Sequence, residues 1–242
     1  MSTITCILSG KDGVGKSTVA ALVGEQLALL GRSVLLVEFE EGLRCLDQYV
    51  GANQSKVFDL DDVLNGRCEL DDAIAVSSLS DNLSVIFAAN GKKSMDTEQF
   101  STLVLAVSDR FDHVIIDTDC SVETLDSISS FSMNNIVVST ADNIGTRDAK
   151  FVCDRLYDMS ITGVKVLFNR VRRDYIADGI TPNLDTAMDN VGVPLIGVMT
   201  ENPDVIRCTS RGILPKKNSQ TYKVFNAIAL RLEGESVPLV VI

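Results

Sequence analysis

Residues 10–18 have the types and spacing of a loop that holds phosphate groups: they read G-K-D-G-V-G-K-S-T and satisfy G-x-x-x-x-G-K-[ST]. The glycines Gly10, Gly13 and Gly15 allow the backbone to wrap tightly, so that consecutive N–H groups point at one anion. Lys16 offers a mobile positive charge to the outer phosphates of a nucleotide, and the Ser17 hydroxyl is a ligand for Mg²⁺. We therefore expect every residue of the segment to contribute to a nucleotide phosphate site: Gly10, Lys11, Asp12, Gly13, Val14, Gly15, Lys16, Ser17 and Thr18.

A second candidate is Asp117, the last residue of the run H-V-I-I-D that begins at His113. Ligands of open α/β sheets bind outside the carboxyl ends of the strands, which is also where Gly10 follows its own strand. Asp117 is therefore expected to support or bind a magnesium ion held by Ser17. The alternative is a solvated aspartate at a strand end. His113, the only histidine of the chain, is interpreted as structural.

The elements that must position these residues alternate between strand and helix along the whole chain. Uniformly apolar runs at residues 4–8, 34–37, 83–88, 114–116, 136–138, 164–168 and 195–199 are typical of strands buried on both faces. Between them, helices are expected at residues 17–30, 57–64, 97–110, 124–131, 146–159, 184–191, 203–209 and 220–232. This order predicts an α/β fold with a three-layer, doubly wound, mostly parallel sheet, in a single domain covering residues 1–242.

Composition and charge restrict the class of protein. The 242 residues are 45% hydrophobic and carry 22 basic against 33 acidic side chains, a formal net charge of −11. A general binder of the nucleic-acid backbone is therefore disfavoured. The six cysteines include no C-x-x-C pair, which argues against zinc, redox and iron–sulfur sites. We find no pattern of a leader or a membrane span, and a cytoplasmic location is expected.

Three stretches resemble a known family. Lys11 directly follows the first loop glycine, residues 34–47 read V-L-L-V-E-F-E-E-G-L-R-C-L-D, and residues 197–212 run from G-V-M-T-E-N through V-I-R to Gly212. They resemble K-G-G-x-G-K-[ST], V-D-x-D-x-G-L-R-N-L-D and G-V-I-P-E-D…V-L-R…G of the MinD/ParA group of deviant P-loop ATPases. Because the three matches span nearly the whole chain in the right order, the sequence is identified as a member of this family, most similar to its MinD branch.

The resemblance implies a P-loop NTPase fold of the SIMIBI type, ATP and Mg²⁺ as ligands, and a homodimer that forms face to face around two ATP molecules. Lys11 would then reach the partner's phosphates and stabilise charge during hydrolysis, in the manner of an arginine finger. The implied function is a nucleotide switch in spatial organisation, either of the cell division site or of a cargo. The implied catalytic residues are Lys11, Lys16, Glu40 and Asp117, and the implied metal ligands are Ser17, Glu38 and Asp117.

Three departures from the family pattern concern ATP hydrolysis. Glu38 and Glu40 stand where the family has aspartates, and the longer side chain would displace the group that orients the attacking water. Residues 117–121 read D-T-D-C-S instead of D-x-P-[AP]-G, so the proline and glycine are absent and Asp119 adds negative charge. Asp12 replaces a loop glycine, with a side chain that can point to solvent. We expect an ATP binder whose turnover is slow or impaired.

Base recognition is expected at the ends of two late strands. Asn169, which follows V-L-F, and the segment of Thr200, Glu201 and Asn202 are similar in position to residues with which family members often hold adenine. A plain turn asparagine is the alternative interpretation of Asn169.

The C-terminal residues 230–242 read L-R-L-E-G-E-S-V-P-L-V-V-I and differ from the basic amphipathic helix of MinD-like proteins. Gly234 and Pro238 oppose a helix, and the basic face that binds a membrane is missing. Residues 237–242 could pack on the fold, form an exposed apolar tail that binds other molecules, or add a strand to the sheet of a partner. Recruitment to a membrane or a cell pole is accordingly expected to need a partner protein.

The expected partners are ATP, a second copy of the chain, and an unidentified activator or cargo protein, whereas DNA is not expected. Two alternatives are kept. A ParA-like DNA segregation ATPase would use the basic residues 170–173, which read R-V-R-R, with Lys216 and Lys217. A nonhydrolytic ATP-dependent interaction module, in polar localisation or in pilus or flagellar assembly, would follow from the altered switch segments.

Overall fold

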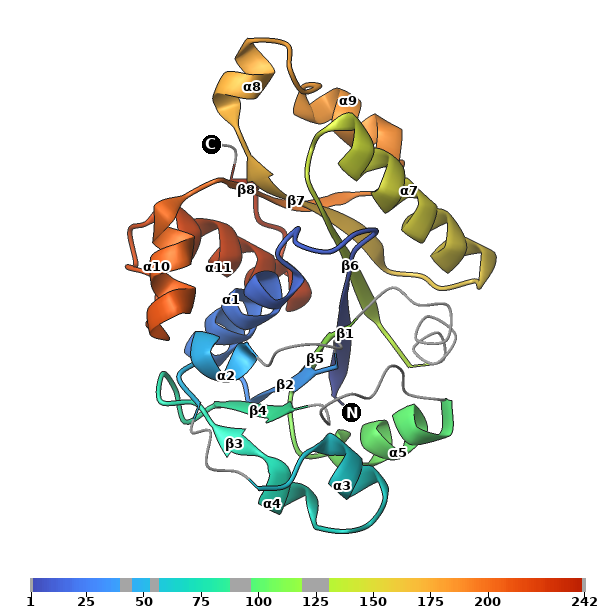
Figure 1. Ribbon diagram of the computed structural model, residues 1–242, viewed down its shortest axis with the longest axis vertical. Coiled ribbons are helices and arrows are strands. Elements are labelled where there is room, and N and C mark those ends of the chain that lie inside the picture. Colours follow the sequence, from blue (N-terminus) through green and yellow to red (C-terminus); the bar gives the residue numbers. More distant parts are fainter. Residues whose placement is uncertain (1, 40–44, 53–56, 88–96, 119–130, 241–242) are drawn as a thin grey trace.

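The computed structural model describes residues 2–39, 45–52, 57–87, 97–118 and 131–240, which build one eight-stranded sheet between layers of helices (Figure 1). The strands lie across the sheet in the order β3-β4-β2-β5-β1-β6-β7-β8. All pairings are parallel except the antiparallel β3–β4 pair. The predicted three-layer, doubly wound, mostly parallel α/β fold is confirmed. The strands are β1 (Thr3–Leu8), β2 (Val34–Glu38), β3 (Ala75–Val76), β4 (Leu83–Phe87), β5 (His113–Asp117), β6 (Asn134–Ser139), β7 (Val164–Val171) and β8 (Leu195–Thr200).

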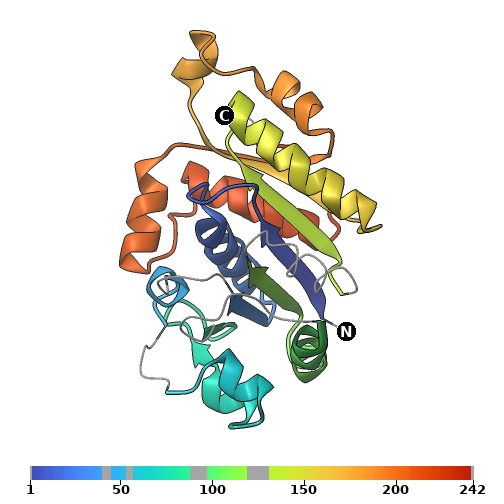
Figure 2. The ribbon, with the colours of Figure 1, turned by 45° about the vertical axis from the view of Figure 1, so that its right-hand side comes forward.

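The helices cover both faces of the sheet. Helices α1 (Lys16–Leu29) and α11 (Gln220–Leu232) contact each other on one face, with α2 (Leu46–Tyr49) and α10 (Pro203–Arg211) beside α1. On the other face α7 (Asn143–Asp158) lies across β6 (Figure 2) and contacts α9 (Leu184–Val191). The remaining described helices are α3 (Leu60–Leu64), α4 (Leu70–Ala73), α5 (Thr97–Val107) and α8 (Arg173–Ala177).

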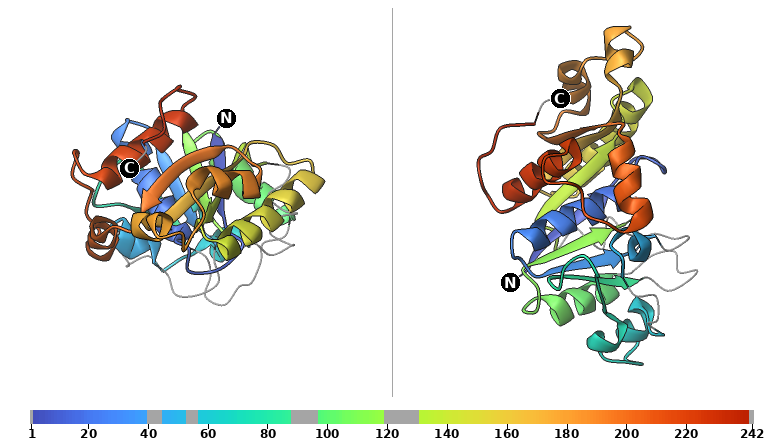
Figure 3. Two further views of the ribbon diagram at one scale, coloured as in Figure 1. Left: turned by 90° about the horizontal axis from the view of Figure 1, so that it is seen from above. Right: turned by 90° about the vertical axis from the view of Figure 1, so that its left-hand side faces the viewer.

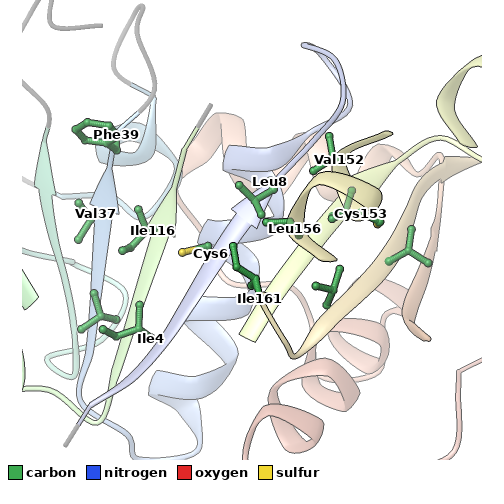
Figure 4. Packing of buried hydrophobic residues seen from close by; sticks show 14 of the residues in the cluster. Ile4, Cys6, Leu8, Val37, Phe39, Ile116, Val152, Cys153, Leu156 and Ile161 are labelled. Atoms are coloured by element: carbon green, nitrogen blue, oxygen red, sulfur yellow. The ribbon is translucent and has the colours of Figure 1, made fainter. Parts of the chain in front are cut away.

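Strand β1 is central to the sheet and is buried on both faces. Cys6 and Leu8 belong to the hydrophobic cluster on the α7 side, whereas Ile7 belongs to the cluster on the α1 side, because successive side chains of a strand point to opposite faces. Figure 4 shows Leu8 pointing toward Leu156 of α7, whereas the sulfur of Cys6 points toward Ile116 of β5. The loop that follows β1 therefore leaves the sheet from a strand that packing holds in place.

Two helices begin at residues other than those predicted, because a side chain caps the first turn of each. Helix α3 begins at Leu60 because the Asp59 side chain accepts a hydrogen bond from the Asp62 N–H, whereas a start at residue 57 was expected. Helix α7 begins at Asn143 rather than at residue 146, because Asp142 caps the N–H groups of residues 144 and 145. The short elements β3, α2, α4 and α8 were not predicted. Nearly all of the helix expected at residues 124–131 lies outside the described residues.

Side chains at the amino ends of the strands join the sheet to the end of α11. The Nε2 of His113 lies 2.6 Å from Oε1 of Glu233, and Arg32 Nε donates to Oε2 of the same carboxylate at 2.6 Å. Burial alone would raise the Glu233 pKa, but the hydrogen bonds from His113 and Arg32 lower it. His113 is buried in this contact, as its structural interpretation requires.

The segment after α11 returns along the edge strand β8. Arg231 donates from Nη1 to the carbonyl oxygen of Ile196 in β8 at 2.7 Å and from Nη2 to that of Val237 at 3.0 Å. Val240 packs against the hydrophobic cluster on the α1 side. These contacts favour packing on the fold as the role of residues 237–240. Within the described part of the chain, the helices are too short or too polar to cross a membrane.

Candidate functional site

The loop between β1 and α1 contains three glycines, and each meets a different steric requirement. Gly13 and Gly15 have φ of 77° and 100°, values that residues with a side chain rarely adopt. A Cβ on Gly10 would lie 2.4 Å from the main-chain oxygen of Asp148 in α7, and one on Gly15 would lie 2.5 Å from Nδ2 of Asn169 in β7. Helix α1 begins directly after Gly15 without a side-chain cap from the described residues. Its first N–H groups can therefore bind an anion in the loop.

Lys16 lies in the interior of this loop. Its residue is 5% exposed, and its Nζ lies 3.7 Å from Oδ1 of Asp12, whose side chain is 97% exposed. The acidic residue that replaces a loop glycine thus points to solvent, and the cation stays inside. This arrangement keeps the Lys16 charge beside the uncapped helix end, where a polyphosphate would find two sources of positive potential.

Lys11 lies exposed on the outer side of the loop, near the N-terminus of α7. Burial acts to raise the pKa of Asp142, but hydrogen bonds from Thr140 and from the Gly145 N–H, together with the charge of Lys11, lower it overall. An exposed lysine at this edge is in a position to contact a second molecule.

Two acidic side chains end neighbouring strands beside the loop. Glu38 ends β2 and Asp117 ends β5, and the parallel register pairs these two residues directly. Both are buried, at 4% and 0% exposure. Burial raises the pKa of Glu38, and the hydrogen bonds that its Oε1 accepts from the N–H groups of Cys45 (2.7 Å) and Leu46 (3.1 Å) partly offset this. The register therefore fixes two carboxylates side by side at the carboxyl edge of the sheet.

Cys45 connects these carboxylates to the loop. Burial raises the pKa of its thiol to about 12; a hydrogen bond with Ser17 lowers it, and the charges of Glu38 and Asp117 raise it further. Ser17, Glu38 and Asp117, the three predicted metal ligands, thus surround one region. Their hydroxyl and carboxylate oxygens fit Mg²⁺. In the described ranges, no three His, Cys, Asp or Glu side chains lie close enough to hold a metal together.

A pocket of about 440 Å³ opens beside the loop and contains every residue predicted for base recognition. Asn169 is 6% exposed, and its Nδ2 donates a hydrogen bond of 2.8 Å to the carbonyl oxygen of Val14. Thr200 accepts a hydrogen bond from Gln220 Nε2 at 2.8 Å. The Glu201 side chain is 57% exposed. The pocket is continuous with the phosphate loop, because Gly15 and Thr18 also line it.

Several lining residues of this pocket were not predicted. Helix α2 contributes Gln48 and Tyr49, and Gln48 Nε2 donates to the Ser210 carbonyl of α10 at 3.1 Å. Helices α2 and α10 lie side by side in both views of the chain (Figures 1 and 3). A helix directly after Thr200 and Glu201 was expected and could have pointed to α10. The four-residue helix α2 has no periodic signal. The other lining residues that were not predicted for base recognition are Arg170, Val205, Ile206 and Thr209.

Comparison with known proteins identifies the family. The family described as "CobQ/CobB/MinD/ParA nucleotide binding domain" matches residues 5–215. The chain belongs to this family. The septum site-determining protein MinD of Synechocystis sp. is 32% identical to this MinD/ParA-family protein over 244 residues, which cover 98% of this chain and 92% of the relative. MinD of Bacillus subtilis is 32% identical over 249 residues, which cover 100% of this chain and 93% of that protein.

Solved structures agree with this assignment. The MinD cell division protein of Aquifex aeolicus aligns with a TM-score of 0.86 at 28% identity, covering 98% of this chain and 100% of that one. A ParA family ATPase from Chlorobium tepidum, at 20% identity and a TM-score of 0.76 over 95% of this chain and 98% of that one, shares the fold. The predicted membership of the MinD/ParA family of ATP-binding P-loop ATPases is confirmed.

Some predicted residues of this MinD/ParA-family protein lie outside the described residues. Glu40, predicted to orient the attacking water, is one of them. Asp119, Cys120 and Ser121 of the altered segment after Asp117 are others. Their roles stay predictions, whereas the structure describes every other residue predicted for catalysis, nucleotide binding or metal binding.

Proposed function

We propose that this protein binds Mg²⁺–ATP in its P-loop and the adjoining 440 Å³ pocket and acts as an ATP-dependent dimeric switch in placing the division site. The observation that carries this proposal is the convergence of three groups at one edge of the sheet. These are the uncapped start of α1 with the buried Lys16, the register-paired carboxylates of Glu38 and Asp117 beside Ser17, and the pocket lined by Asn169. The septum-site role is supported by the names of the relatives.

The phosphate end of the site works by fixed electrostatics. The N–H groups at the start of α1 and the Lys16 ammonium face the same loop interior, so both stabilise the triphosphate in its bound geometry. Ser17, Asp117 and Glu38 would hold the metal, and Mg²⁺, when bound, supplies positive charge to the β- and γ-phosphates. Glu38 keeps one oxygen in hydrogen bonds with the start of α2, and its Oε2 has no hydrogen-bond partner among the described residues. This side chain therefore connects the metal site to α2.

The dimer is supported by the position of Lys11. Its side chain is exposed at the edge of the loop, whereas Lys16 is buried within it. The buried Lys16 can contact the phosphates of a nucleotide bound to its own subunit. The exposed Lys11 can contact the phosphates of a nucleotide bound to a second subunit. Slow turnover remains our expectation, because Glu40, which we expect to orient the attacking water, is one methylene longer than the family's aspartate. Positioning errors of about 1 Å can cost a hundredfold in rate.

A protein partner is supported by a relative. The solved MinC:MinD complex of Aquifex aeolicus contains a chain that aligns with this one at a TM-score of 0.87 and 28% identity. We infer a division-related protein as the partner. A DNA partner has less support, because Arg172, in the middle of the basic run, already pairs with Asp174 and stacks on Tyr175 at 3.9 Å.

Binding of a fluorescent ATP analogue in Mg²⁺ tests the site. Lys16→Ala should weaken binding by about a hundredfold, because it removes a buried cation from a desolvated charge contact. Lys217→Ala, a change at an exposed lysine, is the control and should bind as the wild type does. Equal affinities in the wild type and Lys16→Ala would refute the phosphate site.

Sedimentation and phosphate release test the switch. The wild type should double its mass with ATP and release phosphate slowly. Lys11→Ala should retain ATP binding at low protein concentration but lose both the mass change and the phosphate release. An ATP-bound wild type that stays monomeric at every concentration would contradict the dimer, and mass doubling without phosphate release would favour the nonhydrolytic interaction module.

A further inference from the structure

Arg170 has an unusual backbone conformation at the edge of the nucleotide pocket. Its φ is 54°, and among the described non-glycine residues only Ser160, at 60°, is also positive. The strand register shifts between Phe168 and Val171, where three steps along β7 oppose two steps along β8. Asn169 and Arg170 therefore form a β-bulge, a feature that redirects side chains next to functional sites. A positive φ costs a non-glycine residue on the order of 1–2 kcal/mol.

The bulge brings two consecutive side chains to one pocket. Regular strand residues point alternately to opposite faces of the sheet, yet Asn169 and Arg170 both line the 440 Å³ pocket. Asn169 uses its amide to hold the phosphate loop through Val14. This contact keeps β7 against the loop and places Arg170 next to it, so the strained conformation is maintained by the surrounding structure.

Arg170 is also distinguished by its charge environment. It is the only basic residue among the described residues that line the pocket. Other arginines in this part of the fold have carboxylate partners: Arg172 pairs with Asp174, and Arg207 pairs with Asp204. In contrast, no described residue forms a hydrogen bond or an ion pair with the Arg170 guanidinium. A strained, exposed and unpaired cation at a pocket is most simply explained by a ligand that it contacts.

We propose that Arg170 contacts the bound nucleotide, with its planar guanidinium lying against the face of the base; the inference rests on the nucleotide-binding function proposed above. The phosphate end already has Lys16 and the start of α1, whereas the described residues that line the end of the pocket near Thr200 include no cation besides Arg170. A guanidinium is weakly hydrated and stacks well on aromatic rings. The bulge thus exchanges some stability of the strand for a contact with the ligand.

The test uses a fluorescent ADP analogue at a protein concentration at which the wild type sediments as a monomer. Arg170→Ala should weaken binding about tenfold, as expected for loss of a partly desolvated cation–π contact. Arg170→Gly should weaken binding equally, but its Tm should exceed that of Arg170→Ala by about 2–4 °C, because glycine adopts a positive φ without cost. Arg170→Lys should fall between the wild type and Arg170→Ala.

Two matched controls separate charge from strain. Arg173→Ala removes another exposed arginine, one that does not line this pocket, and it should leave affinity unchanged. Ser160→Gly relieves the other positive φ far from the ligand, and it should raise Tm while leaving affinity unchanged. These two results, together with the loss in both Arg170 variants, would support the proposal.

The contrary outcomes point to different failures. If the ADP affinity of Arg170→Ala stays within twofold of the wild-type affinity, the proposed function stands, but the Arg170 contact is overturned. Unchanged ADP affinity with loss of ATP-dependent mass doubling would overturn it as well and place Arg170 at a subunit interface instead. A wild type that binds neither ADP nor ATP would overturn the proposed function, and this inference with it.

Discussion

The side-chain amide of Asn169 donates a hydrogen bond of 2.8 Å to the carbonyl oxygen of Val14 and thereby ties strand β7 to the phosphate loop. A Cβ on Gly15 would lie only 2.5 Å from the same amide nitrogen. The loop can therefore approach β7 this closely only with glycine at that position. Asn169 was expected to hold the base. The structure shows that it supports the phosphate loop, and in our proposal this one buried side chain serves both phosphate and base binding.

Replacing Asn169 should therefore affect both fold and ligand. Asn169→Ala leaves the buried Val14 carbonyl without its donor, at a cost of about 1–3 kcal/mol, and Tm should fall by about 2–4 °C per kcal/mol. Nucleotide affinity, measured by fluorescence titration, should fall about tenfold, which is the equivalent of one lost hydrogen bond of about 1.4 kcal/mol. The matched control is Asn135→Ala, which removes another buried amide that donates to a carbonyl, that of Thr162, at 3.1 Å. It should lower Tm and leave affinity unchanged; an equal loss of affinity in both variants would contradict the role of Asn169.

The long elements could be predicted because their patterns extend over complete periods. The apolar runs that end at Leu8 and Asp117 are uniformly hydrophobic, as strands buried on both faces require. The segment after Gly15 has apolar residues at helical spacing. The four residues of α2 do not complete two turns, so Gln48 and Tyr49 of the pocket gave no signal. Likewise, arginine does not signal a positive φ, and the bulge at Arg170 depends on the register of β7 with β8, which a single sequence does not specify.

The residues of the site could be predicted where they lie in one contiguous segment. They could not be predicted where their contact depends on which strands pair and in which register. The phosphate loop is one contiguous segment, and its glycine and lysine types follow from anion binding alone. The pairing of Glu38 with Asp117, in contrast, follows from β2 lying beside β5. The resemblance to a family placed both residues at the metal, but residue spacing alone did not place Glu38. Contact between Cys45 and Ser17 was not predicted, because it depends on where the chain returns after β2.

Glu38→Gln should separate the structural role of this side chain from its charge. A glutamine carbonyl oxygen can still accept the hydrogen bonds from the N–H groups of Cys45 and Leu46, so the start of α2 should stay capped. Removing a buried charge should leave Tm of the metal-free protein equal to or above that of the wild type. Mg²⁺-dependent enhancement of ATP binding should fall about tenfold, since an anionic ligand near the metal is lost. Titration of ATP in Mg²⁺ and in EDTA measures this; an unchanged Mg²⁺ effect would remove Glu38 from the metal site. Glu38→Ala, which loses both functions, should also lower Tm.

Arg231 should hold the C-terminal segment on the fold. Its guanidinium bonds the carbonyl oxygens of Ile196 and Val237, and no other described element pairs with the outer edge of β8. Arg231→Ala should release residues 237–240 and lower the free energy of unfolding by about 1–3 kcal/mol, because two part-buried carbonyl groups lose their donor. Arg231→Lys should have an intermediate effect, since one ammonium cannot reproduce the planar fork. Limited proteolysis with mass spectrometry should show faster cleavage after residue 234 in Arg231→Ala. Cleavage at the wild-type rate would show that Val240 alone holds the segment.

Glu25 should make the stability of the protein depend on pH. Its residue is 2% exposed in α1, and burial raises the pKa of the carboxyl to about 8 from 4.5. Between these values the folded chain keeps a proton that the unfolded chain has lost, so the stabilisation is complete below about pH 4.5 and is lost as pH rises to about 8. The free energy of unfolding falls by a few kcal/mol over this range, because each pH unit between the two pKa values contributes roughly 1.4 kcal/mol. Glu25→Gln stays neutral, and its urea unfolding midpoint should match the wild type at pH 5 and exceed it at pH 9. The control, Glu98→Gln, removes an exposed carboxyl and should leave the pH dependence unchanged; a constant difference between wild type and Glu25→Gln at all pH values would refute the linkage.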